Sequence, residues 1–206
     1  MKVNGAIRGA FSFKALLVLL NLSVFFQGEV MAADVERPMY TVLEKNETIE
    51  LRLYEDVVIA EVRVEGSRRW APNNAFMKLF RFISGKNSNE EKIPMTAPVA
   101  QQSVTGETGS WKISFFMPSQ RSLQDLPIPA DEHVQLVRIP RRKMAAIQWI
   151  GSMNEKNLQL QKKALLEFME QKGITTQGEP IIAYYDGPGT IWFEREYEIL
   201  YEILDE

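Results

Sequence analysis

The sequence of 206 residues contains no cysteine and only one histidine. Without a thiol the chain has no thiol catalysis, no thiolate metal site, no disulfide and no thioether link to a cofactor. A single histidine also excludes a multi-histidine zinc site. His133 has two interpretations: a metal ligand or general base oriented by Asp131, or a solvated residue at the start of a strand. We expect the second, because no companion ligand or nucleophile lies near it in the sequence.

Clustered charge is scarce as well. The chain has 24 basic and 27 acidic residues, a net charge of −3, and its densest basic cluster is residues 141–143. A surface that binds a phosphate backbone needs more positive charge, so we predict no nucleic-acid partner.

Motifs for catalysis are missing too. The sequence has no Gly-x-Ser-x-Gly elbow and no glycine-rich phosphate loop after a strand. Glu194, Glu196 and Glu198 alternate along the last predicted strand, which we interpret as a solvated sheet face rather than a catalytic pair. We therefore predict a protein that is not an enzyme, with no catalytic and no metal-binding residues.

No apolar run is long enough to span a membrane. The longest, residues 15–26, has 12 residues, whereas a spanning helix needs about 20. It follows three basic residues and precedes the small residues Ala32 and Ala33, as in a signal peptide. We predict a signal peptide at residues 1–33 and one periplasmic or secreted domain at residues 34–206, without an integral membrane span in the mature form. An uncleaved anchor is the alternative.

Strand-like and helix-like patterns alternate along residues 34–206. One helix is predicted at residues 75–83, where Phe76, Leu79, Phe80 and Ile83 form an apolar stripe. A second should run from a cap at Asn154 to about residue 172, with Gly173 as its stop. Period-two or β-branched segments predict strands at residues 40–43, 49–54, 57–64, 93–101, 111–117, 134–139, 144–150, 180–185 and 191–203.

Each half of this domain therefore reads strand, strand, helix, strand, strand, with an additional strand near the start. Local hairpins with one helix per half favour an α+β fold, a curved antiparallel sheet or open barrel with two helices against it. The domain is also rich in phenylalanine, methionine and tryptophan. Such side chains line grooves for planar hydrophobic ligands but also fill cores, and composition alone favours core packing.

Two neighbouring motifs, FISGKN at residues 82–87 and KIPMTAPV at residues 92–99, resemble the signature of the SOUL heme-binding family. The resemblance extends over about residues 39–203 and implies a distorted antiparallel β-barrel of two similar halves flanked by two α-helices. This agrees with the strand and helix pattern. Further segments match in family order, at residues 40–43, 49–54, 115–118, 126–129, 183–188 and 195–199.

The resemblance implies non-covalent binding of heme or a related tetrapyrrole in a shallow hydrophobic cleft beside the first helix. Carried onto this sequence, Phe76 lines the cleft, with Asn73, Leu79 and Phe80 close by on the same side. Met95 is a further contact from the second motif. These five are the candidate cofactor-binding residues, and we expect a monomer.

Two positions depart from the family pattern. Leu53 stands where a histidine ligand has been proposed in one member, so axial iron ligation is not implied. The family has an arginine suited to a heme propionate at a position that aligns near Asn73, which is uncharged. Lys78 or Arg69 is the substitute here. We therefore predict an exported tetrapyrrole-binding protein without strong axial ligation. The alternatives are an effector or interaction module for small hydrophobic ligands, or a small hydrolase using the same groove.

Overall fold

The computed structural model describes residues 35–187, 189–191 and 193–204. The predicted signal peptide lies outside the described residues, and the chain from Asp34 onward is one compact unit. The described part contains two helices and nine strands: β1 (Tyr40–Asn46), β2 (Ile49–Tyr54), β3 (Val57–Glu65), α1 (Ala71–Ile83), β4 (Val99–Ser103), β5 (Ser110–Phe116), β6 (Val134–Ile139), β7 (Arg142–Ile150), α2 (Glu155–Gln171), β8 (Thr176–Tyr184) and β9 (Glu196–Ile203).

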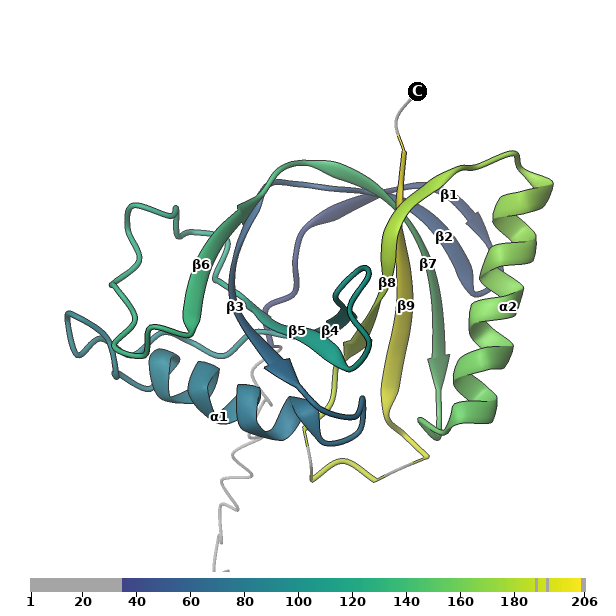
Figure 1. Cartoon of the computed structure of the whole chain (residues 1–206). Helices are drawn as coiled ribbons and strands as arrows, with labels where there is room; N and C mark the ends of the chain where they lie inside the picture. Colours follow the sequence, from purple (N-terminus) through teal and green to yellow (C-terminus); the bar gives the residue numbers. More distant parts are fainter. Residues whose placement is uncertain (1–34, 188, 192, 205–206) are drawn as a thin grey trace, which may run out of the picture. The chain divides into compact units, whose positions relative to one another are not determined.

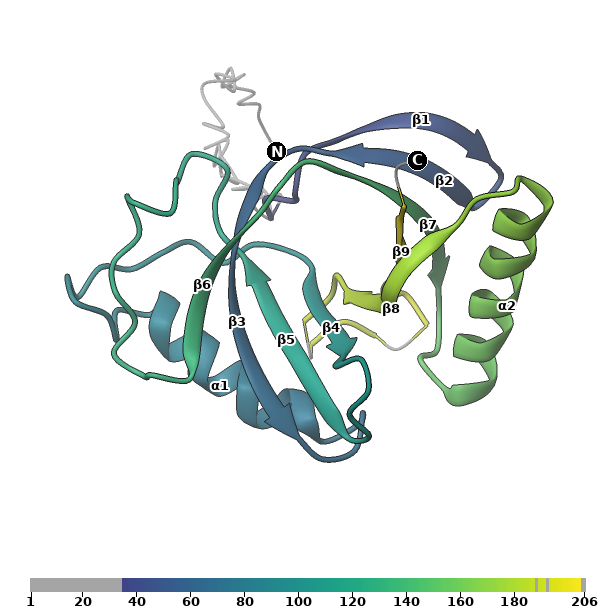
Figure 2. The same cartoon turned by 45° about the horizontal axis from the view of Figure 1, so that its top comes forward.

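All nine strands belong to one antiparallel sheet in the order β1-β2-β7-β9-β8-β4-β5-β3-β6. The sheet curls on itself, and the two helices lie against its outer face (Figure 1). Turning the molecule shows β4 and β8 between the parts of the sheet that carry α1 and α2 (Figure 2). The predicted α+β fold, a distorted antiparallel barrel flanked by two helices, is confirmed.

The two halves exchange their first strands. The repeated unit is strand, strand, helix, strand, strand, and β2 and β6 each open one copy. β2 pairs with β7 and β6 pairs with β3, so each opening strand completes the other half. The segment between β6 and β7 is therefore a crossing between halves rather than a hairpin turn.

Each helix covers its own apolar cluster. The first cluster contains the α1 side chains Leu79, Phe82 and Ile83, which pack on the outward side chains of β3 and β5. Under α2 lie Leu165 and Met169, packed on β7, β8 and β9. In α1 the sequence prediction of the stripe was wrong at one position, because Phe80 is exposed and Phe82 is buried.

Helix α2 begins and ends where the sequence predicts. The Asn154 side chain accepts a hydrogen bond from the Asn157 backbone N–H at 2.9 Å, which satisfies a donor of the first turn. Beyond the last turn, Gly173 has φ of +67°, the left-handed conformation that glycine adopts without steric cost.

The fourth strand is shorter than predicted and begins at Val99 rather than residue 93. Pro94 and Pro98 have no N–H to give to a ladder. The polar groups between them find other partners: Thr96 Oγ1 donates to the Phe116 carbonyl at 2.7 Å, and the Ala97 N–H donates to the Glu36 carbonyl at 2.9 Å. This segment therefore leads into the sheet without belonging to it.

Candidate ligand-binding groove

A groove of about 760 Å³ lies on the outer face of the sheet, between the amino-terminal ends of α1 and α2. Its volume falls within the range of about 300–1,000 Å³ typical of small-molecule sites. Both halves of the domain line it, through Arg68, Arg69, Pro72, Asn73, Phe76, Val99, Gln101, Ile113, Met153, Asn154, Glu155, Tyr184, Asp186 and Arg195.

The α1 side of the groove is aromatic. Phe76 is half-buried, and its ring lies edge-on to Phe115 with the ring centres 5.2 Å apart. Phe80, which does not itself line the groove, stacks nearly parallel to Phe76, with ring centres 6.0 Å apart and an interplanar angle of 9°. Val99 and Ile113 add aliphatic surface from β4 and β5. This side offers a planar apolar ligand a surface of matching character.

Arginines line the groove next to this apolar surface. Arg68 donates to Glu155 at 2.8 Å, an ion pair that links the segment before α1 to the first turn of α2. Arg69 is exposed, with its guanidinium carbon 5.5 Å from the centre of the Trp70 ring. Lys78, the other residue considered for an anionic ligand group, instead binds Asp131 at 2.8 Å and does not line the groove.

Tyr184 and Gln101 form a polar relay in the groove. The Tyr184 hydroxyl donates to Gln101 Oε1 at 2.9 Å, and Gln101 Nε2 donates to the Arg68 carbonyl at 2.9 Å. Burial raises the pKa of Tyr184 above its ordinary value. The phenol is therefore neutral and engaged as a donor at physiological pH, which makes it a poor iron ligand.

The five sequence-predicted residues are only partly brought together. Asn73 and Phe76 line the groove, but Leu79 is fully buried in the core beneath α1. Phe80 is 43% exposed and Met95 39%, and neither lines the groove. A smaller hollow of about 280 Å³ adjoins the groove and shares Arg68, Gln101 and Glu155 of its lining.

The α2 side of the groove was missed from the sequence. Met153, Asn154 and Glu155 precede or open α2, while Asp186 and Arg195 flank the loop between β8 and β9. The only signal for them was the repeat of the half-domain pattern. That repeat predicts a second helix amino terminus but not its position beside the first.

His133 is on the surface. Its Nδ1 lies 2.9 Å from Asp131 Oδ1, and the side chain is 60% exposed. It does not line the groove. Among the described residues no three histidine or acidic side chains gather as metal ligands, and no helix there is long and apolar enough to cross a membrane.

The predicted solvated face of the last strand is wrong for Glu198, which lies on the inner face of the sheet. Glu198 is 2% exposed, not solvated, and accepts hydrogen bonds from Arg52 Nη2 at 2.7 Å and from the Tyr185 hydroxyl at 2.5 Å. Arg52 also donates to Glu50 at 2.7 Å and to the Tyr54 hydroxyl at 3.0 Å. Burial raises the pKa of Tyr54 and that of Tyr185, so both phenols stay neutral.

These features define an α+β barrel of two repeated halves with a ligand-sized groove beside its first helix. A family model described as SOUL heme-binding protein matches residues 35–202, and the chain belongs to this family. The sequence resemblance is therefore confirmed. No curated protein matches the chain.

Solved structures with low sequence identity share the fold. The crystal structure of the EcmrR C-terminal domain aligns with a TM-score of 0.55 at 12% identity, covering 82% of this chain and 99% of that one. A hydrolase from Listeria innocua aligns with a TM-score of 0.55 at 11% identity, covering 79% and 94%. An uncharacterized conserved protein from Listeria innocua aligns with a TM-score of 0.51 at 11% identity, covering 84% and 94%. At such identities the likeness shows the fold alone.

Proposed function

We propose that the protein binds heme or a related tetrapyrrole non-covalently in the groove between α1 and α2, outside the cytoplasm and without strong axial iron ligation. Family membership over residues 35–202 carries the proposal, together with the position of Phe76 and Asn73 in a groove of about 760 Å³. The groove residues fit the ligand: an apolar floor suits the ring, and Arg68 and Arg69 suit its carboxylates.

The groove has few side chains that could ligate heme iron. Of its lining residues, Met153 and Tyr184 have side chains of the kinds that ligate heme iron. Tyr184 is held neutral as a hydrogen-bond donor to Gln101, and Met153 packs against the core cluster under α2. The ring and its carboxylates therefore dominate recognition, so an iron-free porphyrin binds about as well as heme.

We propose a binding role rather than catalysis. Glu155 lines the groove, and a hydrogen bond from Gln159 and the charge of Arg68 hold its pKa below the ordinary value. A general acid or base working near neutral pH needs the opposite shift. The hydrolase from Listeria innocua shares only the fold, so a small-hydrophobe effector module is the leading alternative.

The test is a titration of the purified protein with hemin and with iron-free protoporphyrin, followed by absorbance and tryptophan quenching. We expect saturable binding of both with similar affinity, at micromolar concentrations or below. Hemin binding alone would reveal an axial ligand. If neither saturates at about 1 µM, roughly −8 kcal/mol of binding free energy, tetrapyrrole binding is refuted for this chain.

Asn73→Glu provides a matched site test. Asn73 and Asn74 are both exposed in the first turn of α1, but only Asn73 lines the groove. An acidic residue suits a helix amino terminus, so both variants should fold. We expect Asn73→Glu to weaken porphyrin binding about tenfold, roughly 1.4 kcal/mol, by repelling the carboxylates, and Asn74→Glu to have little effect. Equal effects from the two variants would place the ligand elsewhere.

Export is a separate proposal and rests on the pattern of residues 1–33. We expect mass spectrometry of the protein from its expressing host to find a mature amino terminus after Ala32 or Ala33. Glu36, whose hydrogen bonds to Ala97 and Ser119 hold it to the domain, lies beyond both cleavage positions, so this cleavage leaves those bonds intact. An intact leader on the protein would support the uncleaved anchor instead.

A further inference from the structure

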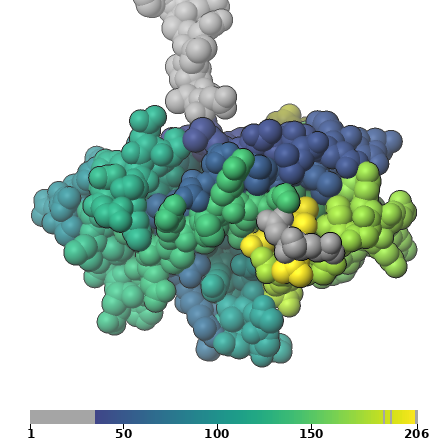
Figure 3. Space-filling model, turned by 90° about the horizontal axis from the view of Figure 1, so that it is seen from above, coloured from purple at the N-terminus to yellow at the C-terminus, as the bar shows by residue number. Residues whose placement is uncertain are grey.

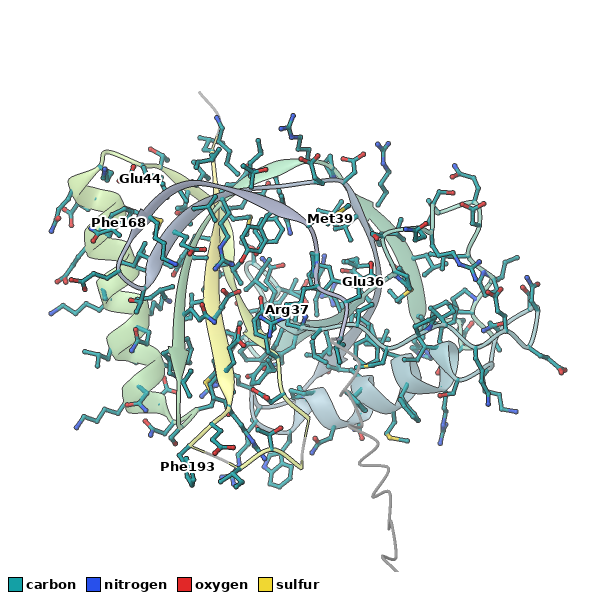
Figure 4. The ribbon with its side chains drawn as sticks, turned by 180° about the vertical axis from the view of Figure 1, so that it is seen from behind. Glu36, Arg37, Met39, Glu44, Phe168 and Phe193 are labelled. Carbon is teal, nitrogen blue, oxygen red and sulfur yellow. The ribbon has the colours of Figure 1, made fainter. Side chains whose placement is uncertain are left out.

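The inner face of the sheet has a cation site that the chain fills with its own side chain. Arg37, on the segment before β1, donates to both carboxylate oxygens of Glu196 with distances of 2.8 and 2.9 Å. Its guanidinium carbon lies 4.3 Å from the centre of the Tyr185 ring. A carboxylate at the edge and an aromatic ring at the face of a planar cation are the elements of guanidinium recognition. Figure 4 shows Arg37 directed toward the sheet, near the β9 strand.

A small apolar chamber adjoins this site. Tyr185 lines it together with Phe116, Met144 and Leu200, and its volume is about 30 Å³, room for about one water-sized group. A second space of about 20 Å³ lies beneath Arg37 and Pro38 and shares the Phe116 lining. Residues of the segment before β1 line the second space but not the first, and neither space is large enough for an organic ligand. A ligand's ring therefore needs the volume that the Arg37 side chain and its segment leave when they move.

The segment is attached by few bonds. The Glu36 carbonyl accepts from the Ala97 N–H at 2.9 Å, the Glu36 carboxylate accepts from the Ser119 N–H at 2.7 Å, and the Met39 carbonyl accepts from the Glu55 N–H at 3.1 Å. Its residues form no strand, and most of their side chains are exposed. Such a segment opens locally at a far lower free energy than global unfolding requires.

The charges around the site select a cation. Arg52 is committed to Glu50 and Glu198, so it does not neutralise Glu196. When Arg37 leaves, the Gln148 side-chain amide still donates to Glu196 Oε1 at 2.7 Å, but a neutral amide does not balance the charge of the carboxylate. The vacated position then presents a carboxylate and the Tyr185 ring beside apolar surface.

We propose that the inner face is a second binding site, distinct from the groove between the helices, for small aromatic cations of the amidinium or guanidinium class. Arg37 occupies the cation position when no ligand is bound and leaves it when one enters. The ligand's charged group takes the place of the Arg37 guanidinium, and its ring takes the volume that the Arg37 side chain and its segment leave, against the Tyr185 ring.

The test compares benzamidinium binding, by calorimetry, in the wild type and in Arg37→Ala. Removing the internal competitor should tighten binding roughly tenfold if Arg37 fills the site about nine-tenths of the time. Neutral benzamide, of the same shape, should gain nothing. The double variant Arg37→Ala/Glu196→Gln should lose the gain. Arg81→Ala, which removes an exposed arginine from the last turn of α1, should bind like the wild type.

Equal affinity in the wild type and Arg37→Ala, or a gain that survives Glu196→Gln, would overturn the proposal. A wild-type measurement keeps the test valid if Arg37→Ala folds poorly. Benzamidinium at millimolar concentration should shift the NMR signals of Tyr185 and Glu196, and shifts confined to the outer groove would also refute the site.

Discussion

Arg52 lies on the inner face of the sheet with 2% of its surface exposed. Its Nε, Nη1 and Nη2 atoms donate to Glu50, Tyr54 and Glu198, and its guanidinium lies 4.3 Å from the centre of the Tyr40 ring. A buried charge is tolerated when it is paired and fully hydrogen-bonded, and it destabilises the fold when one partner is removed. The energetics of the inner face therefore depend on single side chains.

Replacing Arg52 should destabilise the fold strongly. In Arg52→Met the buried carboxylate of Glu198 loses its cation, and we expect a loss of about 3–5 kcal/mol in the free energy of unfolding, measured with urea. Arg52→Met/Glu198→Leu should recover much of that loss. Lys163→Met removes an exposed ion pair to Glu167 on α2 and should change stability by less than about 0.5 kcal/mol. A small loss in Arg52→Met would show that water reaches the network.

Acid should weaken the same network through Glu50. Burial acts to raise the pKa of Glu50, but hydrogen bonds from Lys45 and Arg52 outweigh it, so the pKa lies below the ordinary value of 4.5. The unfolded chain then takes up the proton first as the pH falls, and the stability from this carboxylate, complete above about pH 4.5, is lost below it. Wild-type stability should fall more steeply than that of Glu50→Gln between about pH 6 and pH 3 in urea unfolding. Parallel curves would contradict this.

At the scale of elements, the two helices contribute different parts of the groove. Helix α1 supplies an aromatic ring to the groove through Phe76, while its neighbouring buried side chains, Leu79 and Phe82, pack in the core. Helix α2 supplies its amino-terminal end, where Asn154 is both the cap and a lining residue. The shape of the groove therefore depends on where α2 begins.

Asn154→Ala should destabilise the first turn of α2. Loss of the cap bond to the Asn157 N–H should lower the free energy of unfolding by about 1 kcal/mol, whereas Asn154→Asp keeps an acceptor and should retain stability. Urea unfolding measures both. Equal stability of the alanine and aspartate variants would show that the cap bond contributes little.

At the scale of the molecule, the exchange of β2 and β6 ties the two halves together. Each half lacks one strand that only the other half supplies, and β4 pairs with β8 at the junction. Seen in space-filling form, β1 and β2 run as one exposed rim along the domain (Figure 3). Neither half can complete its sheet alone.

Unfolding should therefore be a single cooperative transition. Trp111 reports on the first half and Trp149 on the second, since they lie on β5 and β7. Variants that keep Trp111 or Trp149 as the single one of the chain's four tryptophans should show the same denaturant midpoint by fluorescence. Two separate midpoints would mean that the halves unfold independently.

Local pattern was enough to predict much of this protein. Period-two alternation indicated the strands, the Asn154 cap and Gly173 bounded α2, and the residue 82–99 motifs indicated the family. These features depend on neighbours in the sequence, which the backbone geometry of strands and helices brings together in a known way. For the candidate site, the sequence reached Asn73, Phe76 and Arg69, all on the α1 side of the groove.

Tertiary structure decided the rest. Sequence period placed Phe80 in the apolar stripe of α1 and Glu198 on a solvated face. The way α1 packs on the sheet exposes Phe80, and the curl of the sheet buries Glu198. The partners of Glu198 are Arg52 and Tyr185, and the groove unites Phe76 with Glu155 and Tyr184. The side of a strand that meets water depends on how the whole sheet closes. This closure cannot be predicted from local sequence, because the closure follows from pairing between strands far apart in the chain.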